Sequence, residues 1–365
     1  MKKILYITNE DNLDLETGVV KKIKAQIQAL EKKNFQVILS GNATIGYIVK
    51  DTINNLEDFY EYKGRNSQKK IFLFMAKYID VVDIIYIRRM MATKYLNDFV
   101  ELCNSKNKKV IIEIPTYPYE NEFKGFKSTL GLMVDRYYRK KLYKYVDRVV
   151  TYSSDLFIFD TPCINISNGI NSAEIIDTLI SKKADTIKFI SVSSLYNWHG
   201  VDRFIKAMNK LKEQKPDLYS IIEFHVVGPR NDYYEFLNKM KNELNVEKVI
   251  FHGFLKNQDL NLLYQNMNIA VGSLGRHRTG NFNLSSLKNK EYIAKGLPII
   301  YSENDMDLDD SDFVYKATCS EELINIGEIL DWYNSLILDN TILDLAREYT
   351  WDKQMEKIVD YINAS

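Results

Sequence analysis

The sequence of 365 residues contains only three cysteines, so few disulfide crosslinks or cysteine-ligated metal sites are possible. Its three cysteines, Cys103, Cys163 and Cys319, are too widely spaced for a metal or redox motif and are predicted to be reduced thiols. Its 49 basic residues balance 49 acidic ones, so no nucleic-acid partner is expected. No run reaches the ~18 apolar residues of a membrane span, and MKKILYITNE reads as a strand rather than a signal peptide. These absences predict a folded, cytoplasmic protein.

What is present is a regular alternation of short apolar runs and amphipathic stretches. Helices are predicted over Val20–Lys33 and Tyr95–Lys106, between runs that read as buried strands: KILYIT, FQVILSG, DIIYIR, KVIIEI and RVVTYS. A second alternating series begins at KFISVSS, after an expected linker at Ser181–Thr186. A chain of this length predicts two doubly wound α/β domains that bind ligands at the carboxyl ends of their strands. Only Gly18 follows the first strand, without GxGxxG, which argues against a nicotinamide dehydrogenase.

The most informative segment is Gly272–Ile300, which reads as strand, polar loop, helix and strand. Anions bind at such a helix N-terminus, where backbone N–H groups are free and the helix dipole is positive. Ser285 and Ser286 are candidate N-caps of this helix, and Lys288 in its first turn can reach a phosphate. Glu291 follows on the same face, so the pair suits the diphosphate and ribose of a nucleotide. An ordinary capped α/β unit explains the spacing equally well.

LKNKEYIAKGLPII resembles the donor-site segment of retaining glycosyltransferases of the GT-B fold, in the group 1 or family 4 class. In that family a glutamate of this helix binds the nucleotide ribose, and a Gly-x-Pro segment leads into the next strand. Glu291, Gly296 and Pro298 match those positions. VSSLYNWHGVDRFIKAM, HVVGP and the run from Ile250 to Val271 resemble further family segments in the same order. The resemblance therefore spans most of residues 188–300.

This resemblance implies an α/β GT-B fold, in which two Rossmann-like doubly wound domains face each other across a cleft. Residues 1–182 would form the acceptor-binding domain and residues 183–345 the nucleotide-sugar domain, with a last helix over 346–365 packing back on the first domain. The implied reaction moves a sugar from a nucleotide diphosphate to a saccharide or lipid-linked saccharide, with retention and without metal. No cofactor is expected, and a UDP-sugar is expected ahead of a GDP-sugar.

Two departures from the family pattern alter the expected donor site. The family carries a sugar-contacting glutamate eight positions before Glu291, where this chain has Asn283. The family also commonly binds the donor phosphates with Arg and Lys, at positions where this chain has Ser194 and His199. The surrounding sequence WHGVDR resembles a subgroup that builds bacterial surface polysaccharides. The residues expected to bind the nucleotide-sugar donor are Gly18, Ser194, His199, Arg276, His277, Asn283, Ser285, Ser286, Leu287, Lys288 and Glu291. Arg278 is an alternative to Arg276 as a phosphate-binding cation.

The candidate catalytic residues are His199 and two polar residues of the segment Glu113–Glu122. This segment follows a predicted strand, and its two prolines favour the extended backbone of a site loop. The resembled family often has a histidine there, whereas this chain offers Glu113 and Thr116. A turn that only docks the next helix is the alternative.

No HExxH motif or Cys/His cluster indicates a metal site. The acidic run from Asp305 to Asp312 contains an Asp-x-Asp, as in metal-dependent GT-A enzymes, but it follows the donor helix and is interpreted as a solvated loop. Two other classes share the GT-B fold, namely a sugar-nucleotide 2-epimerase and a non-catalytic accessory subunit. A membrane-surface scaffold is a third alternative, and nothing in the sequence indicates an oligomeric state.

The segment Phe123–Arg148 is locally basic, with eight Lys or Arg against two Asp, and aromatic residues lie between the charges. A basic amphipathic helix can lie on an anionic lipid surface, which would suit a lipid-linked acceptor at the inner face of the cell membrane. A solvated charged face that packs its aromatic residues on the sheet is the alternative.

Overall fold

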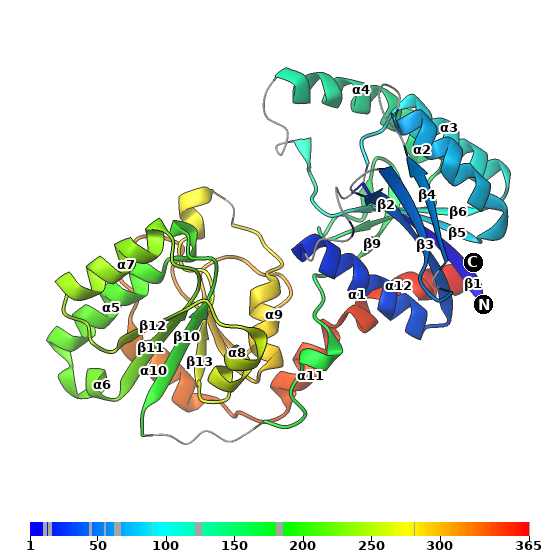
Figure 1. The fold of residues 1–365 in the computed structure, drawn as a ribbon. Coiled ribbons are helices and arrows are strands. Elements are labelled where there is room, and N and C mark those ends of the chain that lie inside the picture. The colour runs from blue at the N-terminus through cyan, green and yellow to red at the C-terminus, as the bar shows by residue number, and fades with distance from the viewer. Residues whose placement is uncertain are drawn as a thin grey trace. The chain divides into compact units, whose positions relative to one another are not determined.

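The computed structural model divides the chain into two compact units, Met1–Ser167 with Trp351–Ser365, and Asn168–Thr350 (Figure 1). The structure describes residues 1–9, 13, 17–43, 46–54, 56–61, 67–88, 90–120, 126–179, 185–280 and 282–364. The predicted boundary at 182/183 lies outside the described residues. The first crossing between units lies earlier because Ile176 N–H donates to the Ala294 carbonyl, 3.0 Å away, which ties this stretch to the second unit.

The first unit contains a mixed sheet. Its strands are β1 (Lys2–Ile7), β2 (Phe35–Ala43), β3 (Gly46–Asp51), β4 (Leu56–Glu61), β5 (Ile84–Arg88), β6 (Lys109–Ile114), β7 (Arg148–Thr151), β8 (Phe157–Ile158) and β9 (Thr161–Asn165). Their order is β4-β3-β2-β1-β5-β6-β7-β9-β8. Each of the five apolar runs predicted as a strand overlaps one, and β1, β2, β5, β6, β7 and β9 pair in parallel.

The sheet of the first unit is not wholly parallel, which corrects the prediction. β3 pairs antiparallel with both β2 and β4. The turn between β3 and β4 is closed by Asp51, whose carboxylate accepts hydrogen bonds from the N–H groups of Ile53 and Asn54, both at 3.2 Å. An aspartate that bonds the backbone two and three residues ahead is a turn signal. The sequence analysis overlooked this signal in DTINN.

Helices cover both faces of this sheet, and they are α1 (Gly18–Lys32), α2 (Ser67–Met75), α3 (Lys94–Ser105), α4 (Phe126–Leu142) and α12 (Trp351–Ala364), with 3₁₀ turns η1 (Ala76–Val81) and η3 (Tyr143–Tyr145). Alternate residues of a strand point to opposite faces. Ile4 and Tyr6 of β1 accordingly belong to one core with α1 and α12, while Leu5 and Ile7 belong to another with α2 and α3. The chain's last helix therefore packs beside its first, as the red and blue helices in Figure 1 show.

The second unit contains a parallel sheet in the order β12-β11-β10-β13-β14-β15. Its strands are β10 (Ile187–Val192), β11 (Ile222–Val227), β12 (Val249–Gly253), β13 (Ile269–Val271), β14 (Ile299–Tyr301) and β15 (Val314–Lys316). Its helices are α5 (Val201–Gln214), α6 (Pro216–Ser220), α7 (Asp232–Glu243), α8 (Asn257–Tyr264), α9 (Leu287–Ala294), α10 (Ile326–Ser335) and α11 (Thr341–Glu348), with 3₁₀ turns η4 (Ser172–Glu174), η5 (Asn197–His199) and η6 (Arg276–Thr279).

The order of these strands defines where the second unit can bind a ligand. The chain builds outward from β10 through β11 and β12, and then returns to add β13 on the other side of β10. Loops that follow two such strands diverge, so ligands of open α/β sheets bind at the carboxyl ends of the strands at this switch point. Helices cover both faces of this sheet as well, and the predicted pair of doubly wound α/β sheets is confirmed. Within the described ranges, no helix has the length and apolar character needed to cross a bilayer.

Candidate functional site

The loops after β10 and β13 meet at the switch point. Leu274 N–H donates to the His199 carbonyl over 2.9 Å, which joins η5 to the loop before η6. Gly200 has a φ of +66°, and a Cβ there would lie 2.6 Å from the Gly275 nitrogen. Glycine is therefore required at position 200, both for its left-handed backbone and for the close approach of the two loops. This contact places His199 beside the residues that follow β13.

Four ionisable residues gather at this point, and we call His199, Arg276, Lys288 and Glu303 the switch-point cluster. They come from the loops after β10, β13 and β14 and from the first turn of α9. Three buried atoms of the cluster have no hydrogen-bond partner in the described part of the chain, namely Lys288 Nζ, Arg276 Nε and Glu303 Oε2. Buried polar atoms are seldom left unpaired, so such a concentration points to a missing polar ligand.

Burial governs the electrostatics of the switch-point cluster. It lowers the pKa of Lys288 to about 8, against the opposing effect of Glu303; Arg276 lowers this pKa further and Glu291 raises it. Burial also lowers the pKa of the Arg276 guanidinium, which Glu303 opposes. Conversely, burial raises the pKa of Glu303, while Lys288 and Arg276 lower it. The cluster thus holds two poorly solvated cations with one buried carboxylate facing them.

His199 is neutral in this environment. Burial, followed by the charges of Lys288 and Arg276, lowers its pKa to about 3. Its Nδ1 accepts a hydrogen bond from Tyr196 N–H over 3.0 Å, so the neutral ring carries its proton on Nε2. His199 therefore offers a hydrogen-bond donor beside the two cations, without a charge of its own.

Glu291 lies on the same helix as Lys288, one turn further along. Burial raises its pKa to about 7, the nearby Glu174 carboxylate raises it too, and Lys295 and Lys288 oppose the change. The first turn of α9 also leaves backbone N–H groups without helical partners. The structure thus brings together the predicted cation, the predicted carboxylate and a helix N-terminus.

The acidic segment Asp305–Asp312 was predicted to be a solvated loop, and this prediction is wrong for Asp305 and Asp307, which bind the first turn of α9 and its surroundings, while Asp310 and Asp312 are exposed. Asp305 has no exposed surface, and its carboxylate accepts from Ser286 N–H over 3.2 Å. Ser286 occupies the N-cap position, and its side chain makes no capping bond, so Asp305 binds the backbone of the N-cap residue from outside the helix. Asp307 forms an ion pair with the buried Lys290 and accepts from the Ser285 hydroxyl over 2.7 Å. Ser285 is therefore a structural partner rather than a helix cap.

Two basic residues of η6 are already occupied. Arg278 pairs with Asp202 at 2.8 Å and with Glu321 at 2.6 Å, and these carboxylates raise its pKa. His277 Nε2 lies 2.7 Å from the same Glu321. Because these partners engage both side chains, Arg276 is the cation of η6 that remains for a ligand.

The other predicted donor residues lie at the rim of this region. Ser194 is exposed, and its carbonyl accepts from Asn231 Nδ2 over 2.9 Å. Asn283 is also exposed, and its side-chain oxygen accepts from Asn304 over 3.0 Å. Leu287 begins α9 with 44% of its surface exposed, so it can contact a ligand only through apolar atoms or its backbone.

The predicted residues of the first unit do not form a comparable cluster. Glu113 has no exposed surface, and its carboxylate accepts from Tyr86 over 2.8 Å and from Tyr152 over 3.1 Å, and pairs with Arg88. A carboxylate enclosed in this way cannot contact a substrate, so we interpret Glu113 as structural. Thr116 is exposed, and Gly18 is an exposed residue at the start of α1 where a Cβ would meet nothing within 4 Å.

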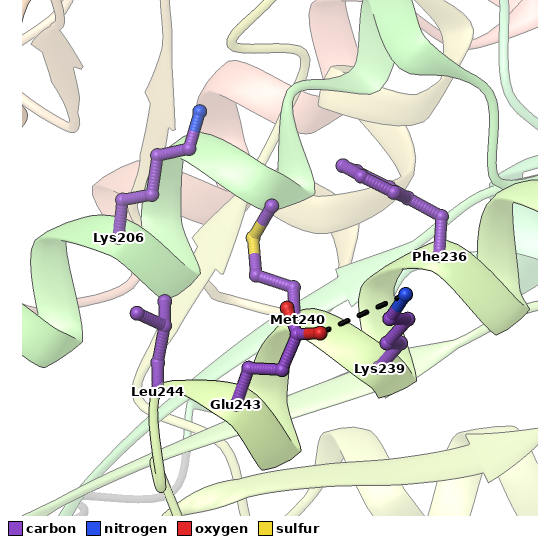
Figure 2. Close-up of a pocket in the computed structure, with 6 residues that line it drawn as sticks. All are labelled: Lys206, Phe236, Lys239, Met240, Glu243 and Leu244. Atoms are coloured by element: carbon purple, nitrogen blue, oxygen red, sulfur yellow. Dashed lines mark ion pairs between the residues drawn. The ribbon is translucent and has the colours of Figure 1, made fainter.

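The described surface also has a pocket of about 340 Å³ in the second unit, between α5 and α7 (Figure 2). Phe236 and Met240 supply its apolar wall, and Lys239 forms an ion pair with Glu243 across one turn of α7. None of the predicted site residues lines it. No group of three or more His, Cys, Asp or Glu among the described residues is placed to hold a metal ion.

Comparison with known proteins finds a family match within the second unit. Residues 174–306 match the family model described as Glycosyl transferases group 1, and this region contains the whole switch-point cluster and Glu291. A search of curated proteins found no significant match.

Solved structures resemble the chain along its whole length. Trehalose-6-phosphate synthase OtsA has 12% identity and a TM-score of 0.61, covering 100% of this chain and 99% of that one. An E. coli structure described as trehalose-6-phosphate bound with UDP-2-fluoro glucose has 13% identity and a TM-score of 0.60, covering 99% of each chain. The lipopolysaccharide outer core galactosyltransferase WaaB, in its apo form, has 12% identity and a TM-score of 0.60, also covering 99% of each.

The fold is therefore GT-B, built from two Rossmann-like units. Within the second unit, residues 174–306 resemble the family described as Glycosyl transferases group 1.

Proposed function

We propose that the second unit binds a nucleotide-diphosphate sugar at the switch-point cluster and that the enzyme transfers the sugar to a saccharide hydroxyl. The observation that carries this proposal is a pair of buried cationic nitrogens without a hydrogen-bond partner in the described structure, Lys288 Nζ in the first turn of α9 and Arg276 Nε in η6. Glu291 would accept hydrogen bonds from the ribose hydroxyls, one helical turn away. A UDP-sugar is the proposed donor, since similar folds include one described as bound with UDP-2-fluoro glucose.

The cluster offers the chemistry that such a transfer needs. When the bond between sugar and diphosphate breaks, negative charge grows on the departing diphosphate and positive charge on the sugar. Lys288 and Arg276 would neutralise the diphosphate, together with the free N–H groups of the first turn of α9. His199 would donate its Nε2–H to a phosphate or sugar oxygen. We further propose retention by same-face attack, which requires no protein nucleophile, and transfer without a divalent metal.

The direct test incubates the purified protein with a panel of nucleotide sugars and saccharide acceptors, in EDTA or in manganese. Release of UDP or GDP with a new glycoside, equal in both buffers, is the expected result. An isomerised sugar would instead indicate an epimerase, and nucleotide binding without turnover would indicate an accessory subunit. Activity that is lost in EDTA and restored by manganese would contradict the metal-independent mechanism.

Replacing Glu291 by glutamine should weaken UDP binding by roughly 1–3 kcal/mol, the value of hydrogen bonds to a charged group. The pKa of Glu291 is raised to about 7, so its carboxylate accepts from hydroxyls above that pH and progressively loses this ability below it. Wild-type affinity should therefore fall as the pH drops below 7, by at most about tenfold per unit, and the variant should lack this acid limb. Calorimetric titration with UDP between pH 5.5 and 7.5 measures both effects. Equal affinity of the two proteins at pH 7.5 would remove Glu291 from the ribose site.

For the acceptor, we propose a lipid-linked saccharide reached through α4. Within Phe123–Arg148, residues 123–125 lie outside the described part of the chain, and the remainder forms α4, η3 and the first residue of β7 rather than one helix. Exposed apolar residues recur at helical spacing along α4: Leu130, Met133, Val134 and Tyr137. Lys140 and Lys141 are exposed at its C-terminal end. This apolar stripe with adjacent cations is the pattern of a helix that lies on an anionic lipid surface.

Reversing the charges of Lys140 and Lys141 to glutamate should reduce binding to anionic liposomes by at least about thirtyfold at low salt. Each basic residue near such a surface contributes about 1 kcal/mol. Arg139 is excluded from the test because it pairs with Glu120 at 3.0 Å, so its reversal would disturb the fold. Reversal of the exposed Lys210 and Lys239 in the other unit is the matched control and should leave liposome binding unchanged. Sedimentation with phosphatidylserine vesicles gives the readout, and equal loss in both double variants would show a nonspecific charge effect.

A further inference from the structure

Glu303 of the switch-point cluster lies after β14, at a strand end where the sequence predicted no site residue. It follows β14 by two residues, and Ser302 N–H donates to the Ser273 carbonyl over 2.9 Å, which ties this backbone to the end of β13. Lys316 donates to the Glu303 carbonyl from β15. The side chain has no exposed surface, so its carboxylate faces inward, beside the start of α9.

We infer that Glu303 is a positioning residue, which keeps the Lys288 ammonium charged for a diphosphate without occupying the hydrogen-bond donors of Lys288 or Arg276. This inference rests on the proposed donor function of the same site. Glu303 forms no ion pair with either cation, although its charge acts on both. Its Oε1 accepts a hydrogen bond from Asn289 Nδ2 over 3.4 Å, and Oε2 has no partner in the described part of the chain.

Lys290, a second lysine of α9, differs from Lys288 because its ammonium is paired within the protein. Lys290 forms an ion pair with Asp307 and also donates to Ser285, so its ammonium donors are engaged within the protein. Lys288 Nζ, two residues earlier, has no such partner. A buried ammonium without a counter-charge would lose its proton, because burial disfavours the charged form. Glu303 supplies that counter-charge from a distance and leaves the donors of Lys288 for a ligand.

The charge of Lys288 depends on the groups that face it. Glu303 and Glu291 raise its pKa, Arg276 lowers it, and His199 faces it as a neutral ring. Among these groups, Glu303 has the largest effect on the pKa of Lys288. Loss of the Glu303 charge should therefore move deprotonation of Lys288 to lower pH, by roughly 1–3 units, as for the loss of one nearby opposite charge.

The test measures UDP affinity by calorimetric titration from pH 5 to 10 for the full-length wild type, Glu303→Gln and Glu303→Asp. Wild-type affinity should fall above about pH 8, where Lys288 loses its proton. In Glu303→Gln this fall should begin roughly 1–3 units lower, and Glu303→Asp, which keeps the charge, should restore it toward the wild-type position. Lys288→Gln should remove the alkaline fall altogether, which identifies the titrating group. A change in affinity at the pH optimum is not the readout, because it also reflects direct repulsion between Glu303 and the phosphates.

An alkaline fall at the same pH in wild type and Glu303→Gln would overturn the inference while leaving the proposed donor site intact. Absence of UDP binding by the wild type at every pH would instead contradict the proposed function itself. Glu303→Ala removes the same charge and leaves room for water, so it provides the same measurement if the glutamine variant does not fold. Glu321→Gln is the control, since Glu321 pairs with His277 and Arg278 outside the cluster. Its alkaline limb should match the wild type.

Discussion

Replacing Lys288 by alanine should lower kcat for sugar transfer by about 10²–10³-fold, the usual cost of removing one preorganised group that stabilises transition-state charge. The Lys288 ammonium is buried and unpartnered, and it lies in the first turn of α9, where a departing diphosphate would gain charge. The same variant should melt at a temperature no lower than the wild type. Its amine forms no hydrogen bond or ion pair in the described structure, and burying an unpartnered charge is unfavourable.

Two measurements on one preparation check this prediction. Single-turnover rates with a saturating nucleotide sugar report the chemical step, and differential scanning calorimetry reports stability. Lys295→Ala, one turn beyond Glu291, is the matched control on the same helix, and it should keep kcat within a few-fold of the wild type. If Lys288→Ala retained full activity, or lost activity only by unfolding, the diphosphate would have to bind elsewhere.

The sequence was sufficient to locate α9, but not to distinguish the roles of its two lysines, Lys288 and Lys290. LKNKEY predicted a helix start, a cation and a carboxylate, and the structure places Lys288 and Glu291 there. What separates Lys288 from Lys290 is Asp307, which comes from the segment after β14. A side chain from another strand end is invisible to local spacing, and for the same reason the sequence analysis read the acidic segment as solvated and overlooked Glu303.

The first unit shows the same limit at a predicted catalytic residue. Glu113 stands near the carboxyl end of β6, where site residues of α/β sheets gather, and this position made it a candidate. Its carboxylate is enclosed by Arg88, Tyr86 and Tyr152, which come from the neighbouring strand β5 and from the residue after β7. Apolar patterning predicts where the strands lie along the sequence, whereas the side chains that meet across neighbouring strands depend on strand order and register. Position along a strand was therefore predictable, and access to solvent was not.

Replacing Lys290 by methionine should destabilise the second unit by about 3–5 kcal/mol, the usual cost of breaking a buried ion pair by removing one partner. Lys290 has no exposed surface, and its loss would leave the Asp307 carboxylate without this cation and remove one of the donors to the Ser285 hydroxyl, to which Asn168 N–H also donates over 3.3 Å. For a domain of this size, that change corresponds to a melting temperature lower by roughly 10 °C. UDP affinity of the folded protein at 20 °C should change little, because Lys290 donates to protein groups rather than to the proposed ligand.

A double-mutant cycle separates the ion pair from the methylene packing of the lysine. Lys290→Met with Asp307→Asn removes both charges, so it should recover part of the stability that Lys290→Met alone loses. Chemical unfolding of the two single variants and the double variant yields the coupling energy. Additive losses would show that the pair contributes no specific interaction. The contrary result is a loss of UDP affinity in Lys290→Met as large as that in Lys288→Ala. That result would contradict the proposed roles, in which Lys288 binds the nucleotide and Lys290 only stabilises the fold.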